Sequence, residues 1–225
     1  MAPIDPRLLL MLDSRSPAGS HSHSGGMEAA VDAGWVSDLA GLADFCRGRL
    51  HTAGSIAAAF AAQSCRGWLA GWCATQWQRL DEELSARTPS EAVRGSSRIL
   101  GSGLRRLLAA TVPDADLHTP WSQIESPAPH HPLVLGAALA LTGGSPALAA
   151  RAAALGACTG PASAAVRLLG LDPYAVHGML ALLGPLIEQV ADRAANASEL
   201  PADSAPALDL LADLHATREV RLFAS

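Results

Sequence analysis

The chain contains no lysine, and this absence limits what its surface can bind. All 16 basic residues are arginines, they form no basic run, and the formal net charge is −5. Proteins that bind nucleic acid usually carry clustered basic residues that neutralise phosphates. We therefore expect no nucleic-acid partner.

Residues that favour β-strands are also scarce. Aromatic residues make up 4% of the chain, whereas Ala and Leu dominate the 49% that is hydrophobic. Ala and Leu are strong helix formers, while aromatic and β-branched residues are favoured in strands. A chain of 225 residues can bury one substantial core. The composition predicts an all-α fold, a single-domain helical bundle of about eight or more helices over residues 1–225.

Cysteine pairs and targeting segments are missing as well. The four cysteines form no Cys-x-x-Cys pair, so we interpret them as small buried hydrophobic residues in a reducing compartment. The apolar run Leu8 to Leu12 is too short for the core of a signal peptide. Charged residues such as Arg151 and Arg167 interrupt the Ala-rich stretch 133–183, so we expect no membrane span. These features predict a cytoplasmic protein whose residues 1–15 form a flexible N-terminal segment.

The helical pattern of the middle of the chain gives further expectations. The chain is almost continuously helical from Ala53 to Ala86, and Trp68, Trp72 and Trp77 lie close together along it, as core residues or as a contact for a partner. The sequence from Thr88 to Glu91 has a cap residue, a proline and a glutamate in the order typical of a helix start, and that helix should run to about Ala110.

The pattern also predicts which charged side chains face solvent and where a proline disturbs a helix. We expect most arginines of the helix after Thr88 to face solvent; these are Arg94, Arg98, Arg105 and Arg106. The acidic clusters Asp81-Glu82-Glu83 and 203–213 are typical of solvated faces. The pair Gly160-Pro161 should kink or break its helix, because proline has no N–H to donate.

Candidate chemistry is sparse. The turn His21-Ser22-His23 resembles a metal site, but no cysteine or carboxylate lies near it in sequence to complete a ligand set. We expect no tightly bound cofactor and only weak metal binding there. His130-His131 precedes Pro132 at a helix entrance and is interpreted as a cap or a polar lining. No nucleophile–base motif occurs, so no enzymatic activity is predicted.

Five stretches, taken in order, are similar to one family. The opening turn, with Pro17, Gly19, Ser24, Gly26, Met27 and Glu28, resembles the N-terminal signature of UreF-type urease accessory proteins. Ser96, Ser97 and Gly101 resemble the family's Arg-x-x-Ser-x-x-x-Gly helix, and His131, Pro132 and Gly136 resemble its next helix entrance. Ala165 to Leu168, which includes Arg167, is similar to its Val-Arg-Leu segment. The last stretch resembles the family's ending and contains His215, Thr217, Arg221, Leu222, Phe223 and Ser225.

The chain also departs from the family pattern. The family usually continues after Val-Arg-Leu with Pro-Leu-Gly-Gln, whereas this chain reads Gly170-Leu171-Asp172-Pro173. His21 stands where the family usually has an aromatic residue. The contacts that the family's glutamines make are therefore in question for this chain.

The resemblance implies a nickel-insertion chaperone of urease. Such a protein is all-helical and homodimeric, bridges a UreD/UreH-type accessory protein and a UreG-type GTPase, and docks them on apo-urease, with nickel as transiently handled cargo. The residues implied in partner binding are Gly26, Glu28, Arg167, His215, Thr217, Arg221, Leu222, Phe223 and Ser225. The three tryptophans and the Ala-rich faces also favour a dimer.

The segment 201–225 is expected to be a partner-binding tail, mobile in the free protein, because its short helix is marginal alone. The alternative to the family role is a cytosolic helical protein that binds a small ligand or a metal.

Overall fold

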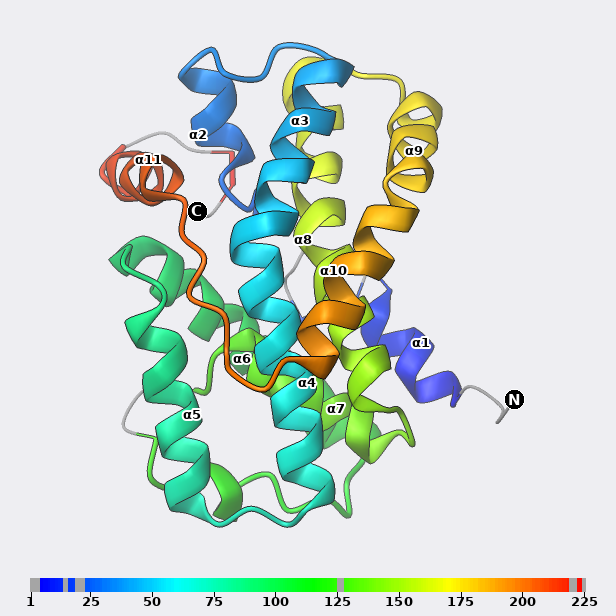
Figure 1. Cartoon of the computed structure of the whole chain (residues 1–225), viewed down its shortest axis with the longest axis vertical. Coiled ribbons are helices and arrows are strands. Elements are labelled where there is room, and N and C mark those ends of the chain that lie inside the picture. The colour runs from blue at the N-terminus through cyan, green and yellow to red at the C-terminus, as the bar shows by residue number, and fades with distance from the viewer. Residues whose placement is uncertain (1–4, 14–15, 19–22, 125–127, 219–221, 224–225) are drawn as a thin grey trace.

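The computed structural model describes residues 5–13, 16–18, 23–124, 128–218 and 222–223. The described residues form helices and contain no β-strand, which confirms the all-α prediction (Figure 1). In chain order the elements are α1 (Pro6–Leu12), α2 (Met27–Asp32), α3 (Leu39–Arg49), η2 (Leu50–Gly54), α4 (Ser55–Leu69), α5 (Ala74–Ala86), α6 (Glu91–Thr111), η3 (Thr119–Trp121), α7 (His131–Leu141), α8 (Pro146–Leu169), α9 (Pro173–Leu182), α10 (Gly184–Asn196) and α11 (Pro206–Ala216).

A long central rod organises the bundle. Helices α3 and α4 follow one another without a break because the π-helical turn η2 joins them. The rod runs down the middle of Figure 1, with α8 packed along it. Single π-turns inside α-helices are uncommon and often lie at functional sites. Arg49, the last residue of α3, is placed directly at this turn.

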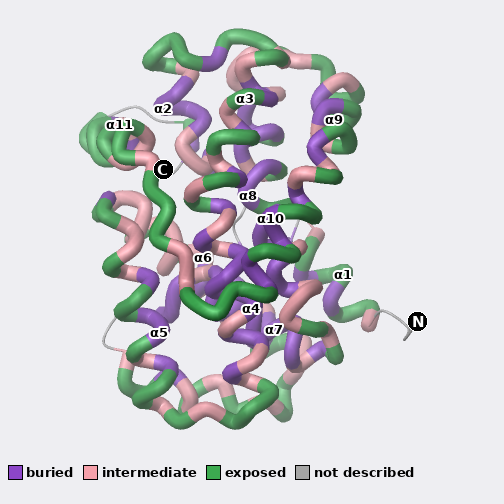
Figure 2. Tube along the Cα trace, in the orientation of Figure 1, coloured by how far each residue is buried: buried purple, intermediate pink, exposed green. Residues whose placement is uncertain are grey.

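The core is built from small side chains. Helix α4 packs against α7 and α8. Alanine is the most frequent of the buried residues of these three helices, and Figure 2 shows buried segments gathered where they meet. Gly136 of α7 illustrates how close the helices lie, because a Cβ atom there would be 2.2 Å from the carbonyl oxygen of Ala61. Alanine and glycine allow such close approach, so the Ala-rich composition defines the packing distance of the core.

Helix α8 differs from its prediction. It continues through Pro161, where a break was expected. Pro161 cannot donate to the carbonyl oxygen of Ala157, but the Nε of Arg49 donates to that oxygen instead, at 3.2 Å. The arginine thus replaces the missing helical hydrogen bond, and the helix is not interrupted. By length and composition α8 could cross a membrane, but here it packs against α4, α7 and α10.

Helix boundaries differ from the predictions in two further places, and the exposure of one cysteine differs as well. Helix α6 is capped by Ser90 and not by Thr88, because the Ser90 hydroxyl accepts from the N–H of Val93 at 3.2 Å. The predicted helix from Ala53 to Ala86 is interrupted between α4 and α5, where Gly71 has a φ of 66°. Cys73 at the start of α5 is exposed, although the other three cysteines are buried as predicted.

The predicted tryptophan stripe lies inside the chain. Trp77 is buried, and its ring centroid lies 5.8 Å from that of Trp68 and 5.5 Å from that of Trp72. Trp121 of η3 joins the group, 5.6 Å from Trp68. The core interpretation is therefore confirmed, and these rings no longer argue for a dimer.

Candidate functional site

The opening glycine turn positions one buried carboxylate. Gly25 and Gly26 have φ values of 59° and 88°, a conformation that glycine adopts without strain. The turn leads directly into α2, whose first turn contains Glu28. A carboxylate is favoured at a helix N-terminus, yet this one is only 6% exposed and needs partners to compensate for burial.

The partners of Glu28 come from the other end of the chain. Its Oε1 accepts the backbone N–H of Leu222 at 2.8 Å, and its Oε2 accepts that of Phe223 at 2.9 Å. The Nε2 of His215, on α11, lies 3.3 Å from the same Oε2. His215 is 2% exposed, so the three contacts form a buried polar junction between α2 and the tail.

Phe223 is held from its other side by Arg167. The guanidinium carbon of Arg167, in the last turn of α8, lies 4.7 Å from the centroid of the Phe223 ring. This is a cation–π contact, and Phe223 is 5% exposed beneath it. Arg167 itself is on the surface, so it is exposed and paired at the same time.

We call Glu28, Arg167, His215, Leu222 and Phe223 the C-terminal clasp. Three separate family-like stretches thus meet in one place. Gly26 supports the clasp through the turn, and an ion pair between Arg218 and Asp32 lies beside it. Among the other sequence-predicted residues, Thr217 donates its hydroxyl to the carbonyl oxygen of Leu214 at 2.8 Å, while Arg221 and Ser225 lie outside the described residues.

Two residues of the expected partner-binding tail, Leu222 and Phe223, contact the body of the same chain in the structure. Glu28 supplies the acceptors for both of their backbone N–H groups. The short helix α11 is also packed, against α2 and α6. At the N-terminus, Leu8 and Met11 of α1 are buried, so this part of segment 1–15 is likewise packed.

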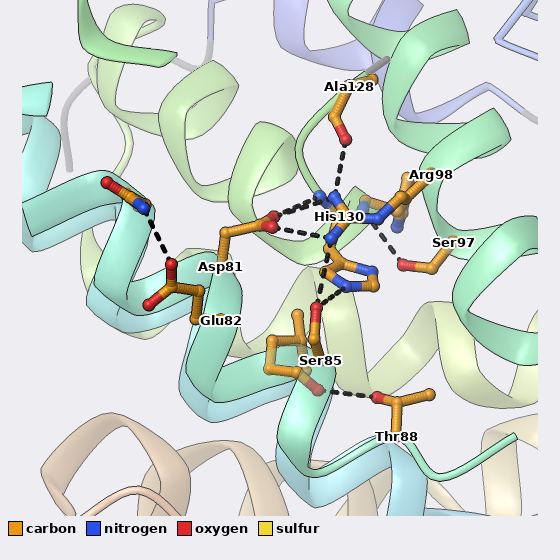
Figure 3. Close-up of polar contacts among 11 residues, drawn as sticks. Asp81, Glu82, Ser85, Thr88, Ser97, Arg98, Ala128 and His130 are labelled. Carbon is orange, nitrogen blue, oxygen red and sulfur yellow. Dashed lines mark hydrogen bonds and ion pairs between the residues drawn. The ribbon is translucent and has the colours of Figure 1, made fainter. Parts of the chain in front are cut away.

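A second polar cluster joins α5, α6 and the start of α7 (Figure 3). Asp81 is 4% exposed, and its Oδ2 accepts from the Nη2 of Arg98 at 2.8 Å. Its Oδ1 accepts the backbone N–H of His130 at 3.0 Å. Two predictions are therefore wrong: Asp81 is not on a solvated face, and Arg98 does not face solvent. Each lies inward because the other neutralises it.

The same cluster contains a serine–histidine contact. The Oγ of Ser85 lies 2.9 Å from the Nε2 of His130 and accepts from the Nη2 of Arg98 at 3.1 Å. Burial lowers the pKa of His130 to about 4, which keeps the ring neutral. In the part of the chain that the structure describes, no group bonds its Nδ1. A catalytic triad needs a carboxylate there to orient the ring. Asp81 binds the main chain instead, so the cluster fixes the junction of three helices.

The histidines considered for metal binding are separated in what is described. His21 lies outside the described residues, and His23 is 8% exposed near the start of α2. His131 is half-buried, its backbone N–H donates to the Ser97 hydroxyl at 3.2 Å, and burial followed by the nearby His23 lowers its pKa to about 4. Within residues 23–124 and the other described ranges, no three metal-binding side chains gather.

Two features were not predicted from the sequence: the Asp81–Arg98 ion pair, and the hydrogen bond from Arg49 to the carbonyl oxygen of Ala157. The pair falls on two helices, so spacing within one helix could not show it. A signal existed for Arg49, because Pro161 in an otherwise helical pattern leaves one carbonyl oxygen that needs a donor.

The described part of the chain is a helical body whose predicted functional residues meet at a terminal clasp, which fits a helical accessory protein. The UreF family model matches residues 36–184. Urease accessory protein UreF of Mycobacterium sp. (strain JLS) is 42% identical over 219 residues, covering 97% of both chains, and that of Mycobacterium tuberculosis (strain H37Rv) has the same identity and coverage. UreF of Mycolicibacterium vanbaalenii is 42% identical over 218 residues.

The chain belongs to the UreF family of urease accessory proteins. Members of this family are chaperones and not enzymes.

Proposed function

We propose that this protein bridges a UreD/UreH-type accessory protein and a UreG-type GTPase on apo-urease in the cytoplasm, with nickel as the cargo of the complex. The single observation that carries the proposal is the C-terminal clasp. It holds Leu222 and Phe223 of the family-like tail on the body of the chain, where the side chain of Leu222 is 67% exposed. A fixed, exposed apolar side chain is a low-entropy contact for a partner.

The surroundings of the clasp support a docking surface for the UreD/UreH-type protein. On α11, Leu210 is 62% exposed and Leu214 is 55% exposed. Leu222 adds a third exposed apolar side chain, and the exposed Arg167 lies over the ring of the adjoining Phe223. An apolar centre with an arginine at its edge is a common composition of protein interfaces.

Leu222→Asp tests this surface. Because the side chain is exposed while its backbone N–H bonds Glu28, the substitution should leave the melting temperature nearly unchanged and abolish pull-down of the UreD/UreH-type protein and urease activation in cells. Leu155→Asp, at a 46% exposed position of α8, is the matched control and should retain both. Full pull-down by Leu222→Asp would refute the clasp as the docking surface.

The contact with the GTPase is a separate part of the proposal. The UreG-type protein should join only after the UreD/UreH-type protein has bound, giving a ternary species by size-exclusion chromatography. Gating of the GTPase would appear as a changed GTP hydrolysis rate when this chain is added. A complex of the UreD/UreH-type and UreG-type proteins that forms equally well without this chain would contradict the bridging role.

We propose a homodimer that forms through α9. The sequence had suggested a dimer from the three tryptophans and the Ala-rich faces instead. Tyr174 and Leu182 on α9 are 88% and 83% exposed, eight positions apart and therefore on one face of the helix. An exposed apolar stripe of this kind is typical of a helix that packs against another chain. Tyr174→Glu should convert a dimer to a monomer by light scattering. An unchanged mass would exclude α9 as the interface.

A further inference from the structure

A cavity of about 240 Å³ lies between the opening turn, the central rod, α6 and α11. Its walls are mainly apolar and include Ile56, Leu100 and Leu208. Two oppositely charged side chains also line it, Arg49 from the rod and Asp209 from α11. Neither the clasp nor the Asp81 cluster uses these two residues.

Arg49 carries a charge that the protein only partly compensates. Its Nε bonds the carbonyl oxygen of Ala157, which is neutral. No carboxylate among the described residues comes within ion-pair distance of its guanidinium. Burial lowers the pKa of Arg49, which reflects the cost of keeping this cation away from water. Because the Nε bond is the one hydrogen bond that the Arg49 side chain forms with the described residues, the other N–H donors of its guanidinium are available for an anionic group.

Asp209 is the matching anion. It is half-buried, burial raises its pKa, and the neighbouring Asp213 raises it further, while Arg49 lowers it. Arg49 is thus close enough to influence Asp209, yet the two do not form an ion pair. Opposite charges that share a cavity without touching leave room for a molecule carrying both complementary charges.

Four other ionisable side chains line the cavity, those of His23, Arg87, His131 and Asp203. Arg87 forms an ion pair with Glu83, and its Nε donates to the carbonyl oxygen of Pro201 at 2.9 Å. His131 is neutral near pH 7, since its pKa is about 4. Asp203 lies on an exposed part of the loop before α11. Arg49 and Asp209 are therefore the half-buried charged side chains of the cavity that form no ion pair within the described part of the chain, and the buried His23 lies in the opening turn on the same wall.

We propose that this cavity binds a small aliphatic zwitterion, of the class of the branched-chain α-amino acids. Arg49 would hold the carboxylate through its fork, Asp209 would hold the ammonium group, and the aliphatic side chain would rest on Ile56, Leu100 and Leu208. Charge-assisted hydrogen bonds to both charged groups discriminate strongly against ligands that lack one of them. The π-helical turn at Arg49 places the guanidinium at the wall of this cavity.

Isothermal titration calorimetry with three probes tests the proposal on the full chain alone. Leucine should bind at least about tenfold more tightly than 4-methylpentanoate, which lacks the ammonium group, and 3-methylbutylamine, which lacks the carboxylate; tenfold corresponds to about 1.4 kcal/mol. Failure of leucine to bind at millimolar concentration, or equal binding of the three probes, would overturn it.

Asp209→Asn makes the test specific. Loss of the anion should weaken leucine about tenfold and strengthen 4-methylpentanoate, because its carboxylate no longer faces a like charge. Asp203→Asn is the control, since Asp203 also lines the cavity but lies in the exposed loop before α11. If Asp209→Asn weakened both ligands equally, Asp209 would not hold the ammonium group and the assignment would be wrong. The measurement needs no urease partner, so it is independent of the bridging proposal.

Discussion

Arg49 donates to the carbonyl oxygen of Ala157 that Pro161, four residues further along α8, leaves without a helical partner. The contact couples the central rod to α8 across the bundle. It also explains why a proline is tolerated in the interior of a 24-residue helix.

A double-mutant cycle should reveal this coupling. Arg49→Met leaves the Ala157 oxygen without its donor and should lower the free energy of unfolding by about 1–3 kcal/mol. In a Pro161→Ala background the restored N–H can bond Ala157, so the same change should cost less. Urea denaturation of the four proteins measures both effects. Equal costs of Arg49→Met in the two backgrounds would contradict the explanation.

Gly101→Ala should destabilise the junction of α6 with the segment before α7. A Cβ atom at Gly101 would lie 2.1 Å from the carbonyl oxygen of Pro129, so the backbone of one segment has to move. We expect a loss of more than about 2 kcal/mol in unfolding free energy. Gly95→Ala on the same helix meets nothing within 4 Å and should be neutral or stabilising by up to about 1 kcal/mol. Similar melting temperatures for the two variants would refute the close contact.

Replacing both residues of the Asp81–Arg98 pair should lower the free energy of unfolding by less than the two single replacements added together. Asp81→Asn leaves a buried guanidinium without its carboxylate, and Arg98→Met leaves the carboxylate without its guanidinium; each should cost about 2–4 kcal/mol. The double variant should lose less than the sum, because neither charge remains unpaired. Chemical denaturation tests this, and strict additivity would show that the two side chains act independently.

Stability should fall as the pH decreases from about 6.5 to about 4. Burial lowers the pKa of His130 and of His131 from 6.5 to about 4 in the folded protein. Between these values the unfolded chain binds a proton that the folded chain does not, so acid favours unfolding by up to about 3 kcal/mol for each histidine. Above pH 6.5 both states are neutral at these positions, and the contribution is fully present.

His131→Asn isolates one of the two contributions. The loss of unfolding free energy between pH 6.5 and 4 should shrink in this variant, as measured by urea denaturation at a series of pH values. A pH profile parallel to that of the parent protein would show that His131 is not protonated differently in the two states.

The helical class and most helix positions could be predicted because they depend on local propensity. Pro173 after Asp172, for example, indicates the start of α9 directly, and Asp172 caps it as such a pattern suggests. Contacts across the bundle could not be predicted in this way. Asp81 appeared solvated because it begins an acidic run, and only the approach of Arg98 from another helix buries it.

The candidate site was predicted as separate pieces. Glu28 and Phe223 each resembled a family position, but the sequence pattern contained no information that one binds the other. Their contact spans 195 positions, beyond any local rule. The same holds for Arg167, because no local pattern could indicate its contact with the ring of Phe223.

The bond between Glu28 and Phe223 has a consequence for how the protein is made. A ribosome synthesises the chain from the N-terminus, so the α2 carboxylate emerges long before the two N–H groups that it accepts, 194 and 195 positions later. Until then the nascent body contains an acidic group in an otherwise closing interior, and the clasp can form only after residues 222 and 223 have been synthesised. Completion of the clasp thus distinguishes a chain that has reached residue 223 from one that has not, at the surface that we propose the partner binds.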